Sequence, residues 1–233
     1  MPIDVYDRRF SERDSALKEA MWHEIASWLA PLMSAPVLDI GCDRGHFIRN
    51  ASGERSASDI RDVGTLLPGV HFVHASGLEL ADLMPNQYFG TVFLSNYLEH
   101  LSSQDQVVAQ LDVVRRLLRP GGRVVILQPN IRLVGASYWD FIDHRVALTE
   151  RSLVEAATLA GFETDTLVVR FLPYTTKGRL PTSALLVRWY LRLPLLWRLF
   201  GKQTLYVGLR RESVADGARL APPGREQLGD EGQ

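Results

Sequence analysis

The stretch from Val37 to Phe47 reads Val-Leu-Asp-Ile-Gly-Cys-Asp-Arg-Gly-His-Phe and decides the fold class. It begins as a short apolar strand, which Gly41 interrupts, and a second glycine follows at Gly45. In α/β proteins such strands stop at glycines and lead into a helix at the edge of a ligand crevice. Glycine permits the sharp turn and lets the helix begin close to a ligand, where its amides favour an anionic group. The stretch therefore predicts a ligand at the end of the first strand, with Asp39 facing it.

The spacing of the glycines separates two classes of nucleotide ligand. A nicotinamide or flavin fingerprint, Gly-x-Gly-x-x-Gly, places its middle glycine beside a pyrophosphate. That position is Asp43 here, and its carboxylate would repel the phosphates. The pattern Asp-x-Gly-x-x-x-Gly instead resembles motif I of the class I S-adenosylmethionine-dependent methyltransferases. Asp43 stands where this family usually has another glycine, and aspartate tolerates the left-handed backbone of such a turn.

The resemblance implies S-adenosylmethionine as the cofactor and assigns residues of several strand ends to its site. Asp59 follows Asp39 by 20 residues at the predicted end of the second strand, where a carboxylate accepts hydrogen bonds from ribose hydroxyls. The alternative for Asp59 is a solvated turn. Ser76 stands where the family often has an aspartate that recognises adenine, so its hydroxyl or the backbone would make that contact. The other predicted cofactor contacts are Gly41, Cys42, Asp43, Gly45, Ile60, Ser95 and Asn96.

The order of predicted elements indicates a doubly wound α/β fold whose sheet has seven mostly parallel strands. The segments 88–101 and 117–122 resemble the same methyltransferase family. We expect a turn at residues 119–122 and a loop of roughly 18 residues after Gln128. The expected strands are residues 37–40, 55–60, 70–74, 91–95, 123–127, 165–172 and 204–209, with helices over 11–33 and 150–160.

The chain is expected to have three parts. Residues 1–36 form a helical N-terminal cap, residues 37–214 form the cofactor-binding domain, and residues 215–233 form a disordered tail with little to bury. The domain carries an insertion, residues 173–203, before its last strand. Because the strand before it is expected to run parallel to the others, the insertion should emerge at the edge of the sheet where the cofactor lies.

Residues 182–200 of the insertion are rich in leucine and tryptophan but contain Arg188, Arg192 and Arg198. These arginines and Pro194 argue against a membrane-spanning helix, whereas a basic amphipathic segment is typical of a helix at a membrane surface. Three interpretations stay open: peripheral membrane contact, a homodimer face, and a cap over the acceptor pocket.

Composition limits the class of partner. Of 233 residues, 46% are hydrophobic and 23% are charged, which suits one globular domain with a buried core. A net charge of −1 gives no overall attraction to nucleic acid, so we expect no nucleic-acid partner. Cys42 is the only cysteine, and the N-terminus lacks the layout of a signal peptide. We therefore expect a cytoplasmic protein, with the inner membrane surface as its peripheral site.

Methyl transfer to an alcohol requires alignment of the acceptor and benefits from a general base. The candidates are His144, oriented by Asp143 or Asp140, and His100, paired with Glu99, because both histidines lie on loops at the expected crevice edge. The structural alternatives are that His100 fixes a helix start and that His144 staples its loop. No spacing of histidines and carboxylates indicates a metal.

The family resemblance does not specify the acceptor. The aromatic segment 138–145 and the basic insertion resemble bacterial methyltransferases linked to cell-surface glycan assembly, which implies O-methylation of a glycan, lipid-linked or other small-molecule acceptor. One alternative is methylation of a soluble or quinone-like metabolite. Another is a non-catalytic binding module at the membrane surface, which the intact residues Asp39, Gly41, Gly45 and Asp59 disfavour.

Overall fold

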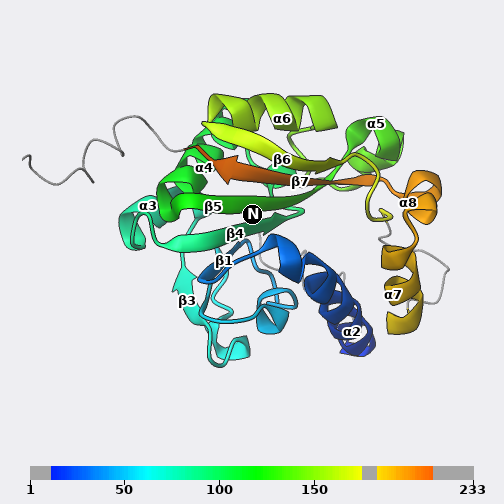
Figure 1. The fold of residues 1–233 in the computed structure, drawn as a ribbon, viewed down its shortest axis with the longest axis horizontal. Helices are drawn as coiled ribbons and strands as arrows, with labels where there is room; N and C mark the ends of the chain where they lie inside the picture. The colour runs from blue at the N-terminus through cyan, green and yellow to red at the C-terminus, as the bar shows by residue number, and fades with distance from the viewer. Residues whose placement is uncertain (1–11, 175–182, 212–233) are drawn as a thin grey trace, which may run out of the picture.

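The computed structural model describes residues 12–174 and 183–211, apart from the side chains of residues 12–16. It confirms a seven-stranded sheet with the order β3-β2-β1-β4-β5-β7-β6 (Figure 1). Six strands share one direction, and β7 runs antiparallel to both of its neighbours. The strands are β1 (Val37–Ile40), β2 (Arg55–Asp59), β3 (His71–His74), β4 (Phe89–Ser95), β5 (Leu118–Pro129), β6 (Phe162–Val168) and β7 (Gln203–Arg210). The tail expected to be disordered lies outside the described residues.

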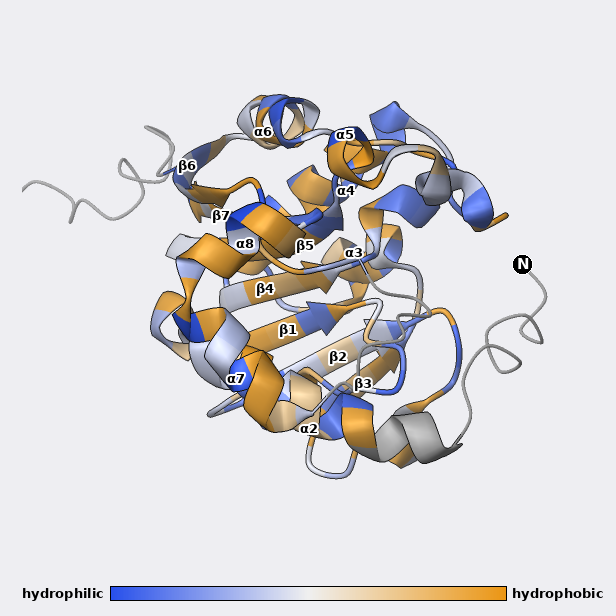
Figure 2. Ribbon diagram, turned by 90° about the vertical axis from the view of Figure 1, so that its right-hand side faces the viewer, coloured by the Kyte–Doolittle hydropathy of each residue, from blue (hydrophilic) through white to orange (hydrophobic). Residues whose placement is uncertain are grey.

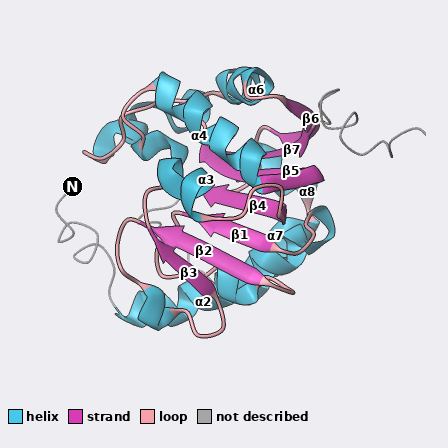
Figure 3. Ribbon diagram, turned by 90° about the vertical axis from the view of Figure 1, so that its left-hand side faces the viewer, coloured by secondary structure: helices cyan, strands magenta, loops and turns pink. Residues whose placement is uncertain are grey.

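Helices cover both faces of the sheet (Figure 3). One face carries α2 (Glu12–Leu29), α7 (Ala184–Arg192) and α8 (Pro194–Phe200), and the other carries α3 (Leu80–Leu83), α4 (Gln104–Leu117) and α6 (Glu150–Leu159). A further short helix is α5 (Ile131–Val134). Short 3₁₀ turns are η1 (Ala30–Leu32), η2 (Ile48–Asn50), η3 (Gly64–Leu66), η4 (Gly77–Glu79), η5 (Leu98–His100) and η6 (Gly135–Asp140).

The central strands divide their side chains between the two helix layers. In β5, Val124 and Ile126 join the core under α4 and α6, whereas Val125 and Leu127 join the core under α2 and α7. All four are buried. A strand covered on both faces reads as a continuous apolar run, which is why β1, β4 and β5 are visible in the sequence.

Side-chain caps begin two of the longer helices. The Ser103 hydroxyl accepts a hydrogen bond from the Gln106 amide at the start of α4. Thr149 and Ser152 bond each other's backbone amides at the start of α6. Side-chain caps of this kind satisfy amides that have no partner within the helix.

Three predicted boundaries are wrong. The turn at residues 119–122 lies inside β5, where the register passes from Phe89 opposite Leu118 to Thr91 opposite Arg123 and so leaves the extra residues as an irregularity. The loop after Gln128 contains α5 and η6. The sixth strand starts earlier and ends at Val168, because the chain bends over residues 169–170 before it reaches the buried Phe171.

The insertion leaves the sheet and returns to it at one place. The Phe171 amide donates to the Gln203 carbonyl at 2.7 Å, and the Lys202 and Gln203 amides donate to the Leu172 carbonyl at 2.8 and 2.9 Å. Between these bonds Ser183 caps α7, and Pro194, which the sequence suggested as a break, begins α8. The predicted helical insertion is confirmed as two short helices, α7 and α8, on the right of Figure 1.

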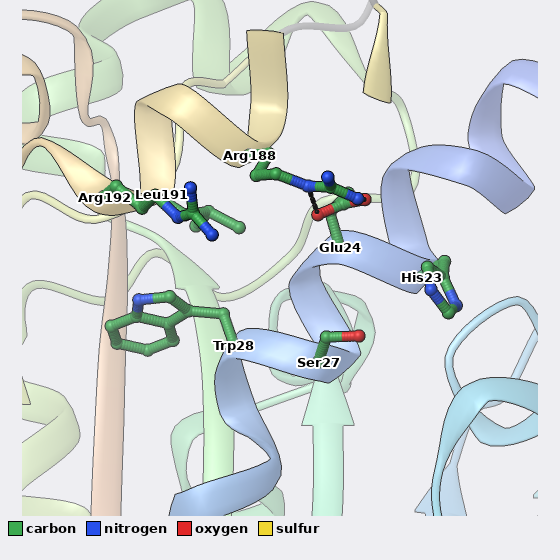
Figure 4. A pocket seen from close by; sticks show the side chains of 7 residues that line it. All are labelled: His23, Glu24, Ser27, Trp28, Arg188, Leu191 and Arg192. Carbon is green, nitrogen blue, oxygen red and sulfur yellow. Dashed lines mark hydrogen bonds and ion pairs between the residues drawn. The ribbon is translucent and has the colours of Figure 1, made fainter. Parts of the chain in front are cut away.

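An ion pair fastens the insertion to the N-terminal helix (Figure 4). Arg188 of α7 donates from Nε and from a terminal nitrogen to the two carboxylate oxygens of Glu24 in α2, at 2.8 and 2.6 Å. Below it Trp28 packs against Phe171 and Trp197. Arg188 therefore holds two helices together, which differs from the expectation that it faces a membrane. The shallow pocket around this pair is lined by His23, Glu24, Ser27, Trp28, Arg188, Leu191 and Arg192.

We predict that Glu24→Gln lowers the melting temperature near neutral pH by a few degrees, because a two-point charge-assisted contact is lost. The hydrogen bonds from Arg188 lower the pKa of Glu24. The stabilisation by a carboxylate with a lowered pKa is complete above the unfolded pKa of about 4.3 and disappears as the pH falls through the folded value. The difference between variant and wild type, followed by circular dichroism, should therefore vanish in acid.

The control is Arg192→Gln. Arg192 is a cation of the same helix that lowers the pKa of Glu24 through its charge alone, without a hydrogen bond, so its loss should change the melting temperature less. Equal melting of Glu24→Gln and wild type near neutral pH would show that the pair does not fasten α7.

Candidate functional site

The carboxyl ends of the parallel strands gather the predicted cofactor residues at one edge of the sheet. Ile40 lies opposite Ser58 on one side and opposite Leu94 on the other. The turn after β1 therefore lies beside the end of β2 and the end of β4. In doubly wound sheets ligands bind at this edge, where the connections of neighbouring strands part.

The turn after β1 has the backbone that its sequence predicted. Gly41, Asp43 and Gly45 all have positive φ, at +70°, +50° and +72°. A Cβ atom on Gly41 would lie 2.5 Å from the Tyr97 ring, so this position requires glycine for two reasons. The expected helix after the turn is wrong, because only the 3₁₀ turn η2 follows. A turn this short has no appreciable helix dipole, and the turn does not bind an anion in that way.

Three carboxylates crowd around the turn. Asp39 is 4% exposed, and its side chain has no hydrogen bond to another described residue. Burial, with the charges of Asp59 and Asp43, raises the pKa of Asp39 well above its usual value. Burial thus penalises an ionised Asp39, and a bound cation would offset that penalty. The electrostatics at this end of β1 favour a positively charged ligand.

Asp59 has its four acceptor positions filled by protein donors. Its Oδ2 accepts from the Asp43 amide at 2.9 Å and from an Arg61 terminal nitrogen at 3.2 Å. Its Oδ1 accepts from the Arg61 amide and Nε, at 2.9 and 3.1 Å. Arg61 also donates to the Asp43 carboxylate at 2.7 Å. Ribose hydroxyls would therefore replace the Arg61 guanidinium at Asp59, a partner that the sequence analysis missed although the two residues are close in sequence.

The remaining predicted cofactor residues line the same edge with different degrees of access. Ile60 is 66% exposed, which is unusual for isoleucine and leaves an apolar surface beside Asp59. The hydroxyl of Ser76 caps η4. Asn96, at φ +48°, donates to the Ser95 hydroxyl. The Cys42 thiol is buried in the core, and burial followed by the nearby carboxylates raises its pKa, so only its backbone can meet a ligand.

The candidate catalytic residues come together after β4. The amides of Arg145 and Val146 both donate to the Glu99 carbonyl, at 2.8 and 3.2 Å, and hold the loop of His144 against η5. The rings of His100 and His144 then meet edge to face with centroids 5.2 Å apart. Sequence separation concealed this contact, because the two histidines are 44 positions apart in the chain.

Each histidine has a partner that the sequence did not predict. Asp143 faces His100: the His100 Nδ1 atom lies 3.2 Å from the Asp143 carbonyl and 3.5 Å from its carboxylate. The His144 Nδ1 atom lies 2.7 Å from the Tyr138 carbonyl. Asp140 is exposed. The carbonyl of Tyr138 thus orients His144 and Asp143 orients His100, while the predicted pairing of Asp143 with His144 stays a prediction.

Glu99 is the member of this cluster whose environment the sequence did not reveal. It is 1% exposed, and its Oε2 atom has no hydrogen-bond partner among the described residues. Burial raises the pKa of Glu99 to about 6, against the opposing effect of His100. Glu99, His100 and His144 offer ligand atoms within 4.8 Å of one another, a grouping of metal-ligand types that linear spacing did not predict.

Tyr97 connects this cluster to the cofactor turn. Its ring covers Gly41, its hydroxyl donates to Gln110 at 2.9 Å, and Glu99 follows two residues later. The cluster therefore follows closely on a residue that lies against the turn after β1.

None of the described helices is long and apolar enough to cross a membrane.

The comparisons with known proteins agree with this geometry. A methyltransferase domain model matches residues 11–167. The tRNA U34 carboxymethyltransferase of Shewanella piezotolerans is 30% identical over an alignment of 117 residues that covers 45% of this chain and 34% of that relative. The match thus spans about a third of the length of the curated relative.

Solved structures share the fold. A chain in the complex of the Haloferax volcanii Trm112 methyltransferase activator with a methyltransferase has a TM-score of 0.61 at 16% identity, covering 86% of this chain and 94% of that one. A SAM-dependent methyltransferase from Archaeoglobus fulgidus has a TM-score of 0.58 at 20% identity, covering 80% and 93%. Because the family model spans more than half of its length, the chain belongs to the methyltransferase domain family.

Proposed function

We propose that the protein transfers the methyl group of S-adenosylmethionine to a hydroxyl of a glycan or lipid-linked acceptor. S-adenosylmethionine is the cofactor of this enzyme class. The observation that supports a hydroxyl acceptor is the cluster of His100, His144 and Glu99. The cluster lies beside the turn after β1, residues 41–45, which we call the cofactor turn. A neutral amine nitrogen is nucleophilic enough to attack without losing a proton first, whereas a protonated alcohol is a poor nucleophile and benefits from groups that take its proton.

The turn after β1 suits this cofactor electrostatically. S-adenosylmethionine carries a sulfonium and an ammonium group, and it supplies an activated methyl group when bound. The buried carboxylate of Asp39, whose pKa is raised, gains stabilisation from such a cation, and Asp43 adds to the attraction. The positive φ angles of Gly41 and Gly45 hold the backbone where a side chain would clash. A negatively charged dinucleotide would be repelled at the same place.

Asp59 and its neighbours would bind the nucleoside. Two vicinal ribose hydroxyls can replace the Arg61 donors at the Asp59 carboxylate, and Arg61 would retain its bond to Asp43. The exposed Ile60 would lie against the adenine ring, which explains why a large apolar side chain stands open there. Ser76 and the Ser95–Asn96 strand end would contribute polar contacts from the two sides of the turn.

At the acceptor, the oxygen lone pair forms the new carbon–oxygen bond while the carbon–sulfur bond electrons go to sulfur. The hydroxyl proton must leave, and His144, His100 and Asp143 form the group that assists its departure. The carbonyls facing the two Nδ1 atoms keep both rings in fixed orientations. Fixed rings are needed because a misplaced catalytic group loses much of its effect.

The surface of α7 and α8 supports an acceptor held at an anionic membrane. Figure 2 shows hydrophobic residues along both helices. No acidic residue occurs between Asp165 and Glu212, and Arg192, Arg198 and Lys202 are cationic. Exposed apolar side chains with cations are typical of helices at a lipid surface. The exposed apolar residues here are Leu185, Leu186, Trp189, Leu193, Leu195, Leu199 and Phe200.

We predict that Asp59→Asn weakens S-adenosylmethionine binding about tenfold or more, because a charged acceptor of the ribose hydroxyls is lost. Calorimetry of the purified chain measures the affinity. The control is Asp62→Asn, an exposed aspartate three residues away that should leave the affinity unchanged. An unaltered affinity of Asp59→Asn with unaltered melting would remove Asp59 from the cofactor site.

We predict that His144→Gln slows methyl transfer by roughly 100-fold or more while cofactor affinity is kept. A lysate treated with enzyme and methyl-labelled cofactor, then separated into lipid, water-soluble and tRNA fractions, measures the transfer. The label should enter the lipid or glycan fraction and survive mild base, as an ether does and an ester does not. The control is His71→Gln. His71 is exposed at the start of β3, the end of the strand opposite to the edge that gathers the predicted site residues.

Label in the water-soluble fraction would instead identify a metabolite acceptor. Label in the tRNA fraction would extend the acceptor named for the Shewanella relatives to this chain. Either result would contradict the proposed acceptor, and no label in any fraction would contradict methyl transfer.

We predict that replacing Arg192 and Arg198 by Gln weakens binding to vesicles that contain phosphatidylserine. Each basic residue near an anionic surface contributes about 1 kcal/mol, so the pair should change the affinity roughly 30-fold. The double control is Arg116→Gln with Arg151→Gln, two exposed arginines of the opposite helix layer. Should the wild type ignore vesicles and sediment as a dimer, the surface is a dimer face.

A further inference from the structure

Three residues from two separate segments bring metal-ligand atoms together beside the cofactor turn. Glu99 and His100 come from η5, and His144 comes from the loop that the Glu99 carbonyl anchors. One suitable atom from each residue lies within 4.8 Å of the other two. The Oε2 atom of Glu99 is buried without a hydrogen-bond partner among the described residues. A buried carboxylate oxygen in this condition is costly unless something binds it.

The two histidines are held in the form that binds a cation. Each Nδ1 atom faces a main-chain carbonyl, that of Asp143 for His100 and that of Tyr138 for His144. A carbonyl oxygen only accepts, so each Nδ1 carries the proton in the neutral ring. The lone pair of each ring is then on Nε2.

We propose that Glu99, His100 and His144 bind a first-row divalent transition cation. Two imidazole nitrogens and one carboxylate oxygen suit Mn²⁺, Co²⁺ or Zn²⁺ better than Mg²⁺, which prefers oxygen ligands. Metal–ligand bonds of about 2.1 Å place two ligand atoms at most about 4.2 Å apart. The observed limit of 4.8 Å means that small side-chain rotations complete the site.

Groups around the three ligands support the same assignment. Metal-bound histidines usually donate their second ring nitrogen to a carbonyl or carboxylate, which fixes the ring. The Asp143 carboxylate, 1% exposed, lies 3.5 Å from His100 in addition to its carbonyl. The Gln128 carboxamide lies beside Glu99 at the end of β5, and neither of its polar atoms has a hydrogen bond of good geometry among the described residues. This part of the site thus contains several buried polar atoms, of Glu99 and Gln128, that have no hydrogen-bond partner of good geometry among the described residues.

Three protein ligands leave coordination positions open, as in catalytic rather than structural metal sites. The inference deepens the proposed function and rests on it for this role: the cation would hold the acceptor oxygen and favour loss of its proton. His100 and His144 would then act as ligands, and Asp143 as the residue that positions His100. Binding of the cation itself depends only on the three side chains.

The test uses the full chain without an affinity tag, stripped of metal with a chelator. Calorimetry with Mn²⁺ and Mg²⁺ and the visible absorption of added Co²⁺ measure binding without reference to activity. We expect one Mn²⁺ or Co²⁺ per chain and weaker binding of Mg²⁺. Glu99→Gln and His144→Gln should each weaken binding at least about tenfold, and the control His71→Gln should not. Circular dichroism checks that each variant is folded.

Absence of saturable binding, or equal binding by Glu99→Gln, His144→Gln and wild type, would overturn the cation site and leave the histidines as proton acceptors. S-adenosylmethionine binding to the same stripped chain is measured separately. If the cofactor binds and no cation does, only this inference fails. If a cation binds and the cofactor does not, the site stands and the proposed function fails.

Discussion

The contact between Gly41 and Tyr97 is the constraint on which the rest of the site depends. Because position 41 has no Cβ atom, the aromatic ring at the end of β4 can lie directly on the turn after β1. The same ring reaches Gly77 and Gln110 on its other side, and so it also fixes the segment after β3. One residue thereby sets the separation between the cofactor turn and the turn that contains Glu99 and His100. The chemistry of the site follows from how closely these two turns approach.

Features that depend on local sequence were predictable. The left-handed turn at Gly41 and Asp43, the cap at Ser103 and the run of β-branched residues in β5 each follow from a few neighbouring residues. The number of strands and the edge that carries the cofactor residues followed from the alternation of such segments.

Features that depend on distant contacts were not predictable in the same way. From its sequence neighbours Arg188 was expected to contact lipid. In the structure it pairs with Glu24, which lies 164 positions earlier in the chain. The pairing of Asp143 with His100 depends on a loop held by the Glu99 carbonyl, which no spacing reveals. Arg61 was missed for another reason. Arg61 is close to Asp59 in the sequence, but only the folded turn shows that its guanidinium bridges the carboxylates of Asp59 and Asp43.

The closure of the insertion by bonds between residues 171–172 and 202–203 has a consequence for how the protein can change. The insertion leaves the sheet and returns to it at a single point. The position of the following strand is therefore set by those few hydrogen bonds and does not depend on the number of residues between them. The entropy of closing a loop grows slowly with length, about 0.6 kcal/mol for each doubling. The length of the insertion is therefore set less by closing its loop than by the packing of Leu191, Trp197 and Arg188 against the core and α2. Residues of α7 and α8 that make none of these contacts can change without disturbing the strand that follows.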